Sequence, residues 1–202
     1  MDSLDFSPAA RWIWGQDDAV SQNAWRYFRR DFSVAHDIKK ATLLITADSR
    51  YECTVNGHFM GRGPARSFPF SYSYDVYDLT PTLIPGETNN LAVLANYLGD
   101  HTMMYIRGRA GYLCEIVLED AHGNVSRCPS NAQWKTAPCL AFNPRAPRIA
   151  IQLDFEEQYD AQLELSGWDA RSYDASNWLN AIRSARWVAN PGFSLSGAQS
   201  RF

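Results

Sequence analysis

The sequence has no apolar run of membrane-spanning length and no concentration of basic residues. A transmembrane helix needs about 20 consecutive apolar residues. The formal net charge is −3 at pH 7. The densest basic cluster, Arg26, Arg29 and Arg30, is too short to follow a phosphate backbone. These absences predict that neither a membrane nor a nucleic acid is a partner.

Two further absences concern the cell compartment. The stretch MDSLDFSPAARW at the start lacks the basic residues and the apolar core of a secretory signal. This favours the cytoplasm, and secretion stays open if the chain is part of a longer protein. The four cysteines include no C-x-x-C pair. Cys53 and Cys114 lie in strand-like stretches and are predicted to be buried, whereas Cys128 and Cys139 would pair only in an exported protein. We expect reduced thiols.

Aromatic residues, by contrast, are abundant. They make up 13% of the sequence and include seven Trp, which indicates either an aromatic core or exposed platforms for flat ligands such as sugars. The core is the commoner use. In the stretch 25–32, alternation places Trp25, Tyr27 and Arg29 on one face.

Short strands separated by Gly, Pro and Asn dominate the local pattern. The strand-like segments are 25–32, 41–47, 51–59, 73–80, 89–98 and 111–128. Asn56-Gly57 predicts a tight hairpin because both residues tolerate positive φ, and a second hairpin is expected at 121–124. Only 155–164 and 175–182 are predicted as short helices. The spacing predicts an all-β fold, an antiparallel β-sandwich.

The domain organisation follows from where large apolar residues stop. Residues 1–188 are predicted to form one β-sandwich domain, since a chain of this length can bury a single large core. Residues 189–202 are rich in Pro, Gly and Ser and are predicted to be a linker-like tail that leads to downstream domains.

The stretch GRGPARS at 61–67 resembles a phosphate-binding loop at first sight. A dinucleotide fingerprint, however, needs a third glycine where Arg66 stands and a helix after it. A Walker loop needs Gly-Lys-Ser/Thr, which is absent. The glycines are therefore predicted to form a bend, and Arg62 and Arg66 to pair with carboxylates such as Asp75 or Asp78.

No catalytic constellation emerges from the remaining polar residues. Four carboxylates cluster in one predicted helix, whereas a glycosidase pair faces across a cleft; they are Glu156, Glu157, Asp160 and Glu164. The four histidines show no zinc-ligand spacing, and no G-x-S-x-G elbow is present. We predict no catalytic residue and no metal ligand in this chain.

The order of several motifs resembles a known family. WIW is followed by FRRDF, ITADSRYECTVNGHFMGRGPARS, YDVYDLTPTLIPGETNNLAVLANYLGD and EEQYDAQLELSGWDARSYDASNWLNA. In this order they resemble the N-terminal β-sandwich region of bacterial-type α-L-rhamnosidases, over residues 11–188. The resemblance implies a jelly-roll sandwich of the galactose-binding-domain-like type.

The resemblance also implies a function. Members of that family are multidomain inverting glycosidases whose catalytic carboxylates lie in a downstream (α/α)₆ barrel. It therefore implies a non-catalytic accessory domain that packs on or borders the catalytic domain of the same polypeptide. The alternative is an autonomous module that binds terminal rhamnose or a related sugar. Some sandwiches of the family bind rhamnose with calcium, so calcium is suggested by resemblance alone.

A sugar site on a sandwich needs an aromatic face and a few planar polar groups. The candidate carbohydrate-binding residues are Arg62, Arg66, Tyr72, Tyr74, Asn96 and His101. The alternative for the two tyrosines is packing on neighbouring strands. Asp48, Arg50 and Asp75 are instead candidates for buried charge pairs. An exposed apolar patch is expected where the sandwich meets a neighbouring domain.

Overall fold

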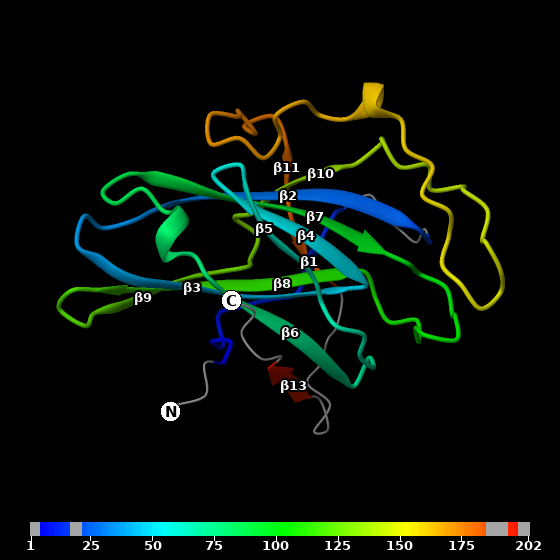
Figure 1. Ribbon diagram of the computed structural model, residues 1–202, viewed down its shortest axis with the longest axis horizontal. Coiled ribbons are helices and arrows are strands. Elements are labelled where there is room, and N and C mark those ends of the chain that lie inside the picture. Colours follow the sequence, from blue (N-terminus) through cyan, green and yellow to red (C-terminus); the bar gives the residue numbers. More distant parts are fainter. Residues whose placement is uncertain (1–4, 17–21, 185–193, 198–202) are drawn as a thin grey trace.

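The computed structural model describes residues 5–16, 22–184 and 194–197. Two β-sheets pack face to face in it (Figure 1). The first sheet contains β1 (Ile13–Trp14), β3 (Ile38–Asp48), β6 (Ser71–Asp78), β8 (Gly111–Asp120), β9 (Val125–Pro129), β12 (Ile182–Arg183) and β13 (Ser194–Gly197). The second contains β2 (Ala24–Ser33), β4 (Arg50–Val55), β5 (His58–Gly63), β7 (Thr88–Tyr97), β10 (Lys135–Pro138) and β11 (Leu179–Asn180).

The strand order shows how distant parts of the chain are joined. It is β12-β1-β8-β3-β6-β13 in the first sheet, with β9 paired to β8, and β11-β10-β2-β7-β4-β5 in the second. The longest pairings, β2 with β7 and β3 with β8, are antiparallel, whereas β13 runs parallel to β6. The prediction of an antiparallel β-sandwich is confirmed.

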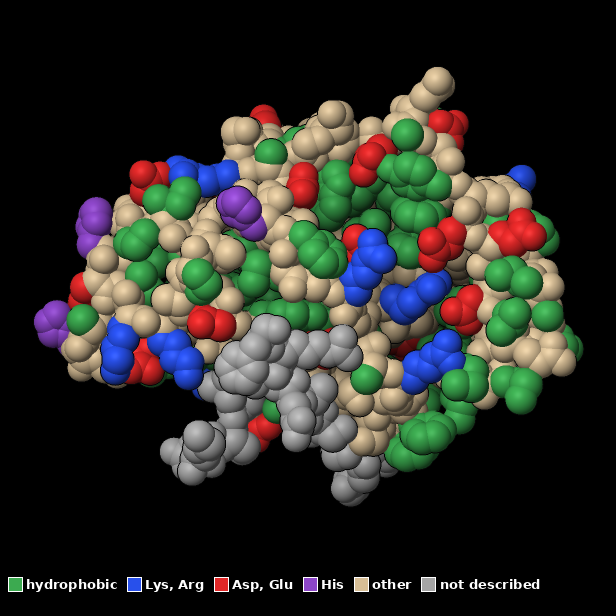
Figure 2. All heavy atoms as spheres, viewed as in Figure 1, with side chains coloured by type: hydrophobic (Ala, Val, Ile, Leu, Met, Phe, Trp, Pro, Cys, Tyr) green, Lys and Arg blue, Asp and Glu red, His purple; other side chains and the backbone are tan. Residues whose placement is uncertain are grey.

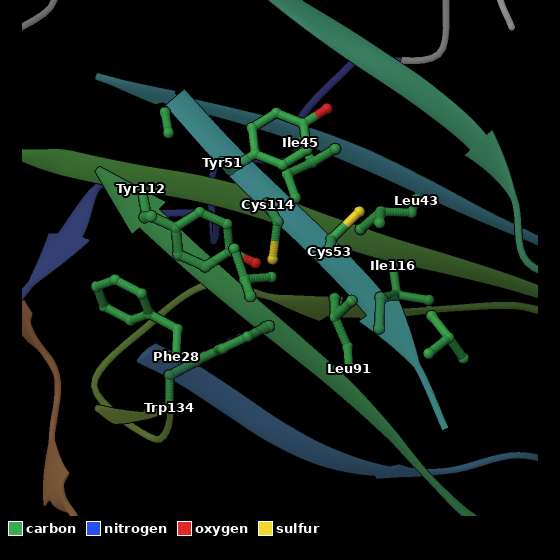
Figure 3. Packing of buried hydrophobic residues seen from close by; sticks show 14 of the residues in the cluster. Phe28, Leu43, Ile45, Tyr51, Cys53, Leu91, Tyr112, Cys114, Ile116 and Trp134 are labelled. Atoms are coloured by element: carbon green, nitrogen blue, oxygen red, sulfur yellow. The ribbon is translucent and has the colours of Figure 1, made fainter. Parts of the chain in front are cut away.

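The core lies between the two sheets and follows the two-residue period of strands. Alternate side chains of β3 and β8 meet those of β2, β4 and β7 (Figure 3). The residues labelled there are Phe28, Leu43, Ile45, Tyr51, Cys53, Leu91, Tyr112, Cys114, Ile116 and Trp134. The aromatic enrichment therefore serves the core in large part. All four cysteines are free, with Cys53 and Cys114 buried as predicted.

Both predicted hairpins are present. β4 and β5 are joined at Asn56 and Gly57, whose φ angles are 52° and 80°. β8 and β9 are joined by a turn with Gly123 at a φ of 83°. A residue with a Cβ rarely adopts such angles, and Asn and Gly are the residues that tolerate them best.

Neither of the two predicted helices is present in the described residues. Of the segment 155–164, only Ala161–Leu163 forms a single 3₁₀ turn, η2, capped by Asp160, whose side chain accepts a hydrogen bond from Gln162 N. The helix predicted over 175–182 is wrong, because that stretch supplies β11 and the start of β12. The other 3₁₀ turn, η1, spans Thr80–Thr82. In 175–182, backbone pairing of β11 with β10 and of β12 with β1 has overridden a weak local pattern.

A long connection, the covering segment (residues 139–178), runs from β10 to β11 over the outer face of the second sheet (Figure 1). Tyr27 packs on Trp168 with the rings tilted and their centroids 4.6 Å apart. The buried guanidinium of Arg29 donates to the Trp168 carbonyl over 2.8 Å, and Trp25 stacks on Phe142 at 4.0 Å. Trp25, Tyr27 and Arg29 thus share one face, as predicted, and the covering segment packs on that face.

The predicted tail, 189–202, lies mostly outside the described residues. Its described part, Ser194–Gly197, is a strand that pairs with β6. The boundary at 188 stays a prediction. No helix of the described ranges has the length and apolar character needed to cross a bilayer, and the cytoplasmic location stays a prediction.

Candidate functional site

A pocket opens where β3 ends and β4 begins. Its volume is about 160 Å³. It is lined by Ala47, Asp48, Ser49, Arg50, Pro64, Ala65, Arg66, Ser67, Tyr72, Leu98, Met104, Tyr105 and Asp154. Figure 2 shows basic side chains gathered over this end of β4 and β5, with acidic side chains between them and hydrophobic ones beyond. We call this cavity the loop-end pocket.

The floor of the loop-end pocket is the carboxylate of Asp48, which is 1% exposed. Tyr72 Oη donates a hydrogen bond to Asp48 Oδ2 over 2.6 Å. Tyr105 Oη donates to Oδ1, as does Ser49 Oγ over 3.1 Å. Burial raises the pKa of Asp48, and these hydrogen bonds oppose the rise. Asp48 thereby joins the end of β3 to β6 and to the loop 99–110.

Two arginines stand at the rim of the pocket in different surroundings. Arg50 Nη1 lies 3.7 Å from Asp154 Oδ2 and 3.6 Å from Glu157 Oε1, and its Nη2 donates to Asn96 Oδ1 over 3.3 Å. Arg66 is exposed and lines the pocket, yet it has no ion pair or hydrogen bond with any residue that the structure describes. Among the described residues, Arg66 is therefore a cation at the rim without an acidic partner.

Arg62 lies outside the pocket and is already neutralised. Its Cα is opposite that of Glu52 across β4 and β5, and Nη2 is 2.9 Å from Glu52 Oε1. Arg62 thus pairs with a carboxylate as predicted, but the partner is Glu52 and not Asp75 or Asp78. Asp75 is buried and accepts a hydrogen bond from Tyr51 Oη over 2.5 Å.

The expected charge pairs among Asp48, Arg50 and Asp75 do not form within the described residues. Tyrosine hydroxyls satisfy both buried aspartates, while Arg50 turns to the acidic residues of the covering segment. The physical reason is burial. A neutral hydroxyl satisfies a carboxylate without requiring that a second charge be taken out of water.

The six predicted sugar-site residues do not converge. Arg66 and Tyr72 line the loop-end pocket, and Tyr72 also packs on Trp12 at 5.0 Å. The others lie elsewhere: Tyr74 packs edge-on against Phe6, Asn96 is buried in β7, His101 belongs to the neighbouring loop and Arg62 lies on β5. The sugar site stays a prediction, and of the six residues the loop-end pocket brings together Arg66 and Tyr72.

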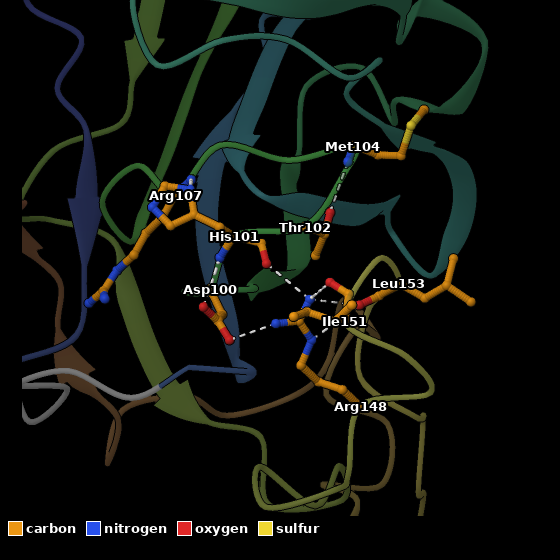
Figure 4. Close-up of polar contacts among 8 residues, drawn as sticks. All are labelled: Asp100, His101, Thr102, Met104, Arg107, Arg148, Ile151 and Leu153. Atoms are coloured by element: carbon orange, nitrogen blue, oxygen red, sulfur yellow. Dashed lines mark hydrogen bonds and ion pairs between the residues drawn. The ribbon is translucent and has the colours of Figure 1, made fainter.

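His101 belongs to a clasp between the loop 99–110 and the covering segment (Figure 4). Arg148 Nη1 donates to Asp100 Oδ2 over 2.9 Å, and its Nη2 donates to the His101 carbonyl over 2.9 Å. The same guanidinium donates to the carbonyl of Leu153. The clasp fixes both loops beside the pocket.

Exposed apolar side chains surround this clasp. The set comprises Met103, Met104, Ile106, Ile149, Ile151 and Leu153, with Met103 and Ile151 each 77% exposed. We call it the apolar tip. Figure 4 shows Met104 and Leu153 directed away from Arg148. Large exposed apolar patches on a domain mark interaction sites.

Calcium can be tested against the donors present. Within the described ranges, the one group of three candidate ligands is Asp37, Asp120 and His122, at the opposite end of β3 and β8, where Asp120 already accepts from the His122 and Asn124 amides. The loop-end pocket offers two carboxylates faced by two arginines. Ca²⁺ takes six to eight oxygen ligands, so neither set fits it.

Comparison with known proteins gives the family. Residues 36–196 match the "Alpha-L-rhamnosidase N-terminal domain" family. The chain belongs to this family. An α-L-rhamnosidase of Streptomyces avermitilis is 29% identical over 184 residues, which are 89% of this chain and 15% of that protein. The α-L-rhamnosidase N-terminal domain described here thus spans a small part of its curated relatives.

Solved structures agree with this assignment. A glycoside hydrolase family 78 rhamnosidase of Bacillus sp. GL1 superposes with a TM-score of 0.85 and 35% identity, over 96% of this chain and 20% of that one. A lectin of Pleurotus ostreatus superposes with a TM-score of 0.61 at 22% identity, over 94% of this chain and 46% of the lectin. The latter likeness shows the fold alone.

Sequence reasoning missed three residues that shape this rhamnosidase N-terminal domain. Tyr105 closes the pocket on Asp48 from 57 positions away in the sequence, and Arg148 clasps a loop 48 positions away. Asp154 reaches the rim from the covering segment. A tyrosine or arginine in a loop carries no local signal for such a partner, so only the folded chain reveals them.

Proposed function

We propose that this chain is the non-catalytic N-terminal accessory domain of an α-L-rhamnosidase and that it packs on a following domain of the same polypeptide. The observation that carries the proposal is the superposition on 20% of the rhamnosidase of Bacillus sp. GL1 at 35% identity. A domain that corresponds to a fifth of an enzyme serves the remainder by binding, positioning or shielding it.

The buried carboxylates of the described residues support a non-catalytic role. Asp48 and Asp75 are held by tyrosine hydroxyls. Glu115, which is fully buried, accepts from the Ser7 amide over 2.7 Å and from Arg127 Nη1 over 2.9 Å. A hydrolytic pair needs one carboxylic acid and one base that both face the scissile bond. These three groups are occupied in holding elements together.

The apolar tip is the surface we assign to the following domain. Its side chains are exposed on two loops that Arg148 holds in one geometry. A pre-organised apolar surface loses little conformational entropy on docking. The partner chemistry that fits is a largely uncharged, apolar face, since six large hydrophobic side chains would lose favourable burial opposite charges.

The deciding assay is hydrolysis of 4-nitrophenyl α-L-rhamnopyranoside. The chain alone should release no nitrophenol above the uncatalysed rate, whereas the longer polypeptide that carries it should turn the substrate over. Turnover by the chain alone would contradict the non-catalytic role. A longer polypeptide inert toward rhamnosides would contradict the enzyme assignment.

The docking surface is tested in the same longer polypeptide. Changing Met103 and Ile151 to Ser should lower the cooperativity of its thermal unfolding, because the two domains then separate before they melt. Phe59 and Leu140 are exposed and lie outside the apolar tip, and changing both to Ser is the matched control. If both pairs behave alike, the apolar tip is not the interface.

A second candidate function is carbohydrate binding by the domain itself. It is favoured by the loop-end pocket, which combines an aromatic residue, Tyr72, with the cation of Arg66. Sugar sites are small, concave and built from a few such groups. The pocket is separate from the apolar tip except at Met104, so both roles are compatible.

A further inference from the structure

The charged residues that line the loop-end pocket are two arginines and two aspartates, and they are not all paired with one another. Arg50 is offset by Asp154 within the pocket and by Glu157 outside it. Asp48 is 1% exposed and its oxygens are occupied by hydroxyl donors. Arg66 is left without a partner among the residues that the structure describes. Among the described residues, Arg66 is therefore the one lining cation whose guanidinium is open to a ligand.

The remaining lining suits a small ring with an apolar side. Pro64, Leu98 and Met104 supply apolar surface, and Ser67 supplies a hydroxyl. The volume of about 160 Å³ is below the range of roughly 300–1,000 Å³ that holds drug-sized ligands. A single pyranose matches this combination, because its C–H face is apolar and its edge carries hydroxyls.

We propose that the loop-end pocket binds an acidic sugar, a hexuronate, through its carboxylate and without calcium, with Arg66 as the anchoring cation. The inference rests on the carbohydrate-binding function proposed above and names its ligand class. A guanidinium is planar and matches a carboxylate with two parallel hydrogen bonds, which gives both affinity and orientation.

A monoanion fits better than a phosphate. Only one lining guanidinium, that of Arg66, lacks a partner among the described residues, and Asp154 stands at the same rim. A dianion would be repelled by this carboxylate and would leave one of its own charges unmatched. Nor does the pocket hold the run of backbone amides typical of phosphate loops, since Pro64 lacks an N–H group.

The test is calorimetric titration of the chain with methyl β-D-glucuronide and methyl β-D-glucoside, which differ only in a carboxylate and a hydroxymethyl group. We expect saturable binding of the glucuronide, at least tenfold weaker binding of the glucoside, and no effect of EDTA. Sodium acetate should compete only at far higher concentration, because it lacks the ring.

Variants connect the affinity to the pocket. Arg66→Gln should weaken glucuronide binding at least tenfold, and Arg66→Lys, which keeps the charge but loses the planar fork, should fall between. Arg145 is exposed and outside the pocket, so Arg145→Gln is the matched control and should bind like the parent. Thermal melts establish that each variant is folded.

Four results would overturn the proposal: equal affinity for the two glycosides, unchanged affinity in Arg66→Gln, competition by acetate as strong as by the glucuronide, or no saturable heat from either sugar. Binding that prefers L-rhamnose and is lost with EDTA would also overturn it, while leaving carbohydrate binding in place. The accessory-domain proposal is read separately, from rhamnoside hydrolysis.

Discussion

Replacing Gly63 by alanine tests why a glycine ends β5. A Cβ added at Gly63 would lie 1.9 Å from Asp75 Oδ2 and 2.7 Å from Tyr51 Oη. These two atoms form a buried hydrogen bond between β4 and β6. The new methyl group must therefore displace Asp75 or break its bond with Tyr51. Either movement happens in a closely packed interior with little room to relax.

The magnitude follows from the two effects. Forcing an extra carbon into a packed core costs about 1–3 kcal/mol, and losing a hydrogen bond to a charged group costs about 1.5–3 kcal/mol. The sum is about 3–6 kcal/mol, against a total stability of about 5–15 kcal/mol for a typical domain. At about 2–4 °C per kcal/mol for a domain of this size, Gly63→Ala should lower the Tm by about 6–24 °C.

The assay is urea denaturation followed by tryptophan fluorescence. Gly57→Ala is the control, because Gly57 has a φ of 80° but no atom within 4 Å of an added Cβ, so only the backbone strain of about 1–2 kcal/mol applies. Adding Asp75→Ala to Gly63→Ala should cost less than the sum of the two single changes, since the clash has one partner fewer. If Gly63→Ala costs no more than Gly57→Ala, the steric reasoning is refuted.

Three further predictions concern other parts of the domain. Burial raises the pKa of Asp48. The contribution of this group to stability is therefore present below its ordinary pKa of about 3.9 and is lost as the pH rises through the raised value. Urea denaturation of the parent between pH 4 and 7 should show this decline in stability, and Asp48→Asn should lack it. Arg148→Met should lower stability by about 1–3 kcal/mol and speed amide hydrogen exchange in residues 99–106 without changing the rest of the sandwich. A thiol reagent should label Cys128 first, because it is partly exposed, and should reach Cys53 and Cys114 only on unfolding, since burial raises the pKa of both.

The part of the fold that the sequence predicts is the part set by local rules. Residues two positions apart on a strand share a face, so Leu43 and Ile45 lie together on the core side of β3. The turn at Asn56 and Gly57 needs positive φ at both positions, and few other residue pairs supply it. Both signals lie within a few residues of the structure that they specify.

The covering segment is the part that local rules do not reach. It has no strand or helix period, and its position depends on contacts such as that of Arg29 with the Trp168 carbonyl, 139 residues away. The same holds for the floor of the pocket, where Tyr105 meets Asp48. Non-local contacts of this kind leave no pattern in a window of ten residues. Helices were therefore predicted over 155–164, which forms one 3₁₀ turn, and over 175–182, which supplies β11 and the start of β12.

The stretch GRGPARS joins both kinds of information. Its glycines are required by close contacts, because a Cβ at Gly61 would meet Tyr77 and a Cβ at Gly63 would meet Asp75. The sequence motif alone resembles a phosphate loop and does not reveal these contacts. Its arginines look equivalent in the sequence. Arg62, however, faces Glu52 across a strand pair, whereas Arg66 lies three residues after Gly63, the end of β5, and lines a pocket. Because a charge already neutralised on the surface contributes little to binding, only Arg66 is available to recognise an anion.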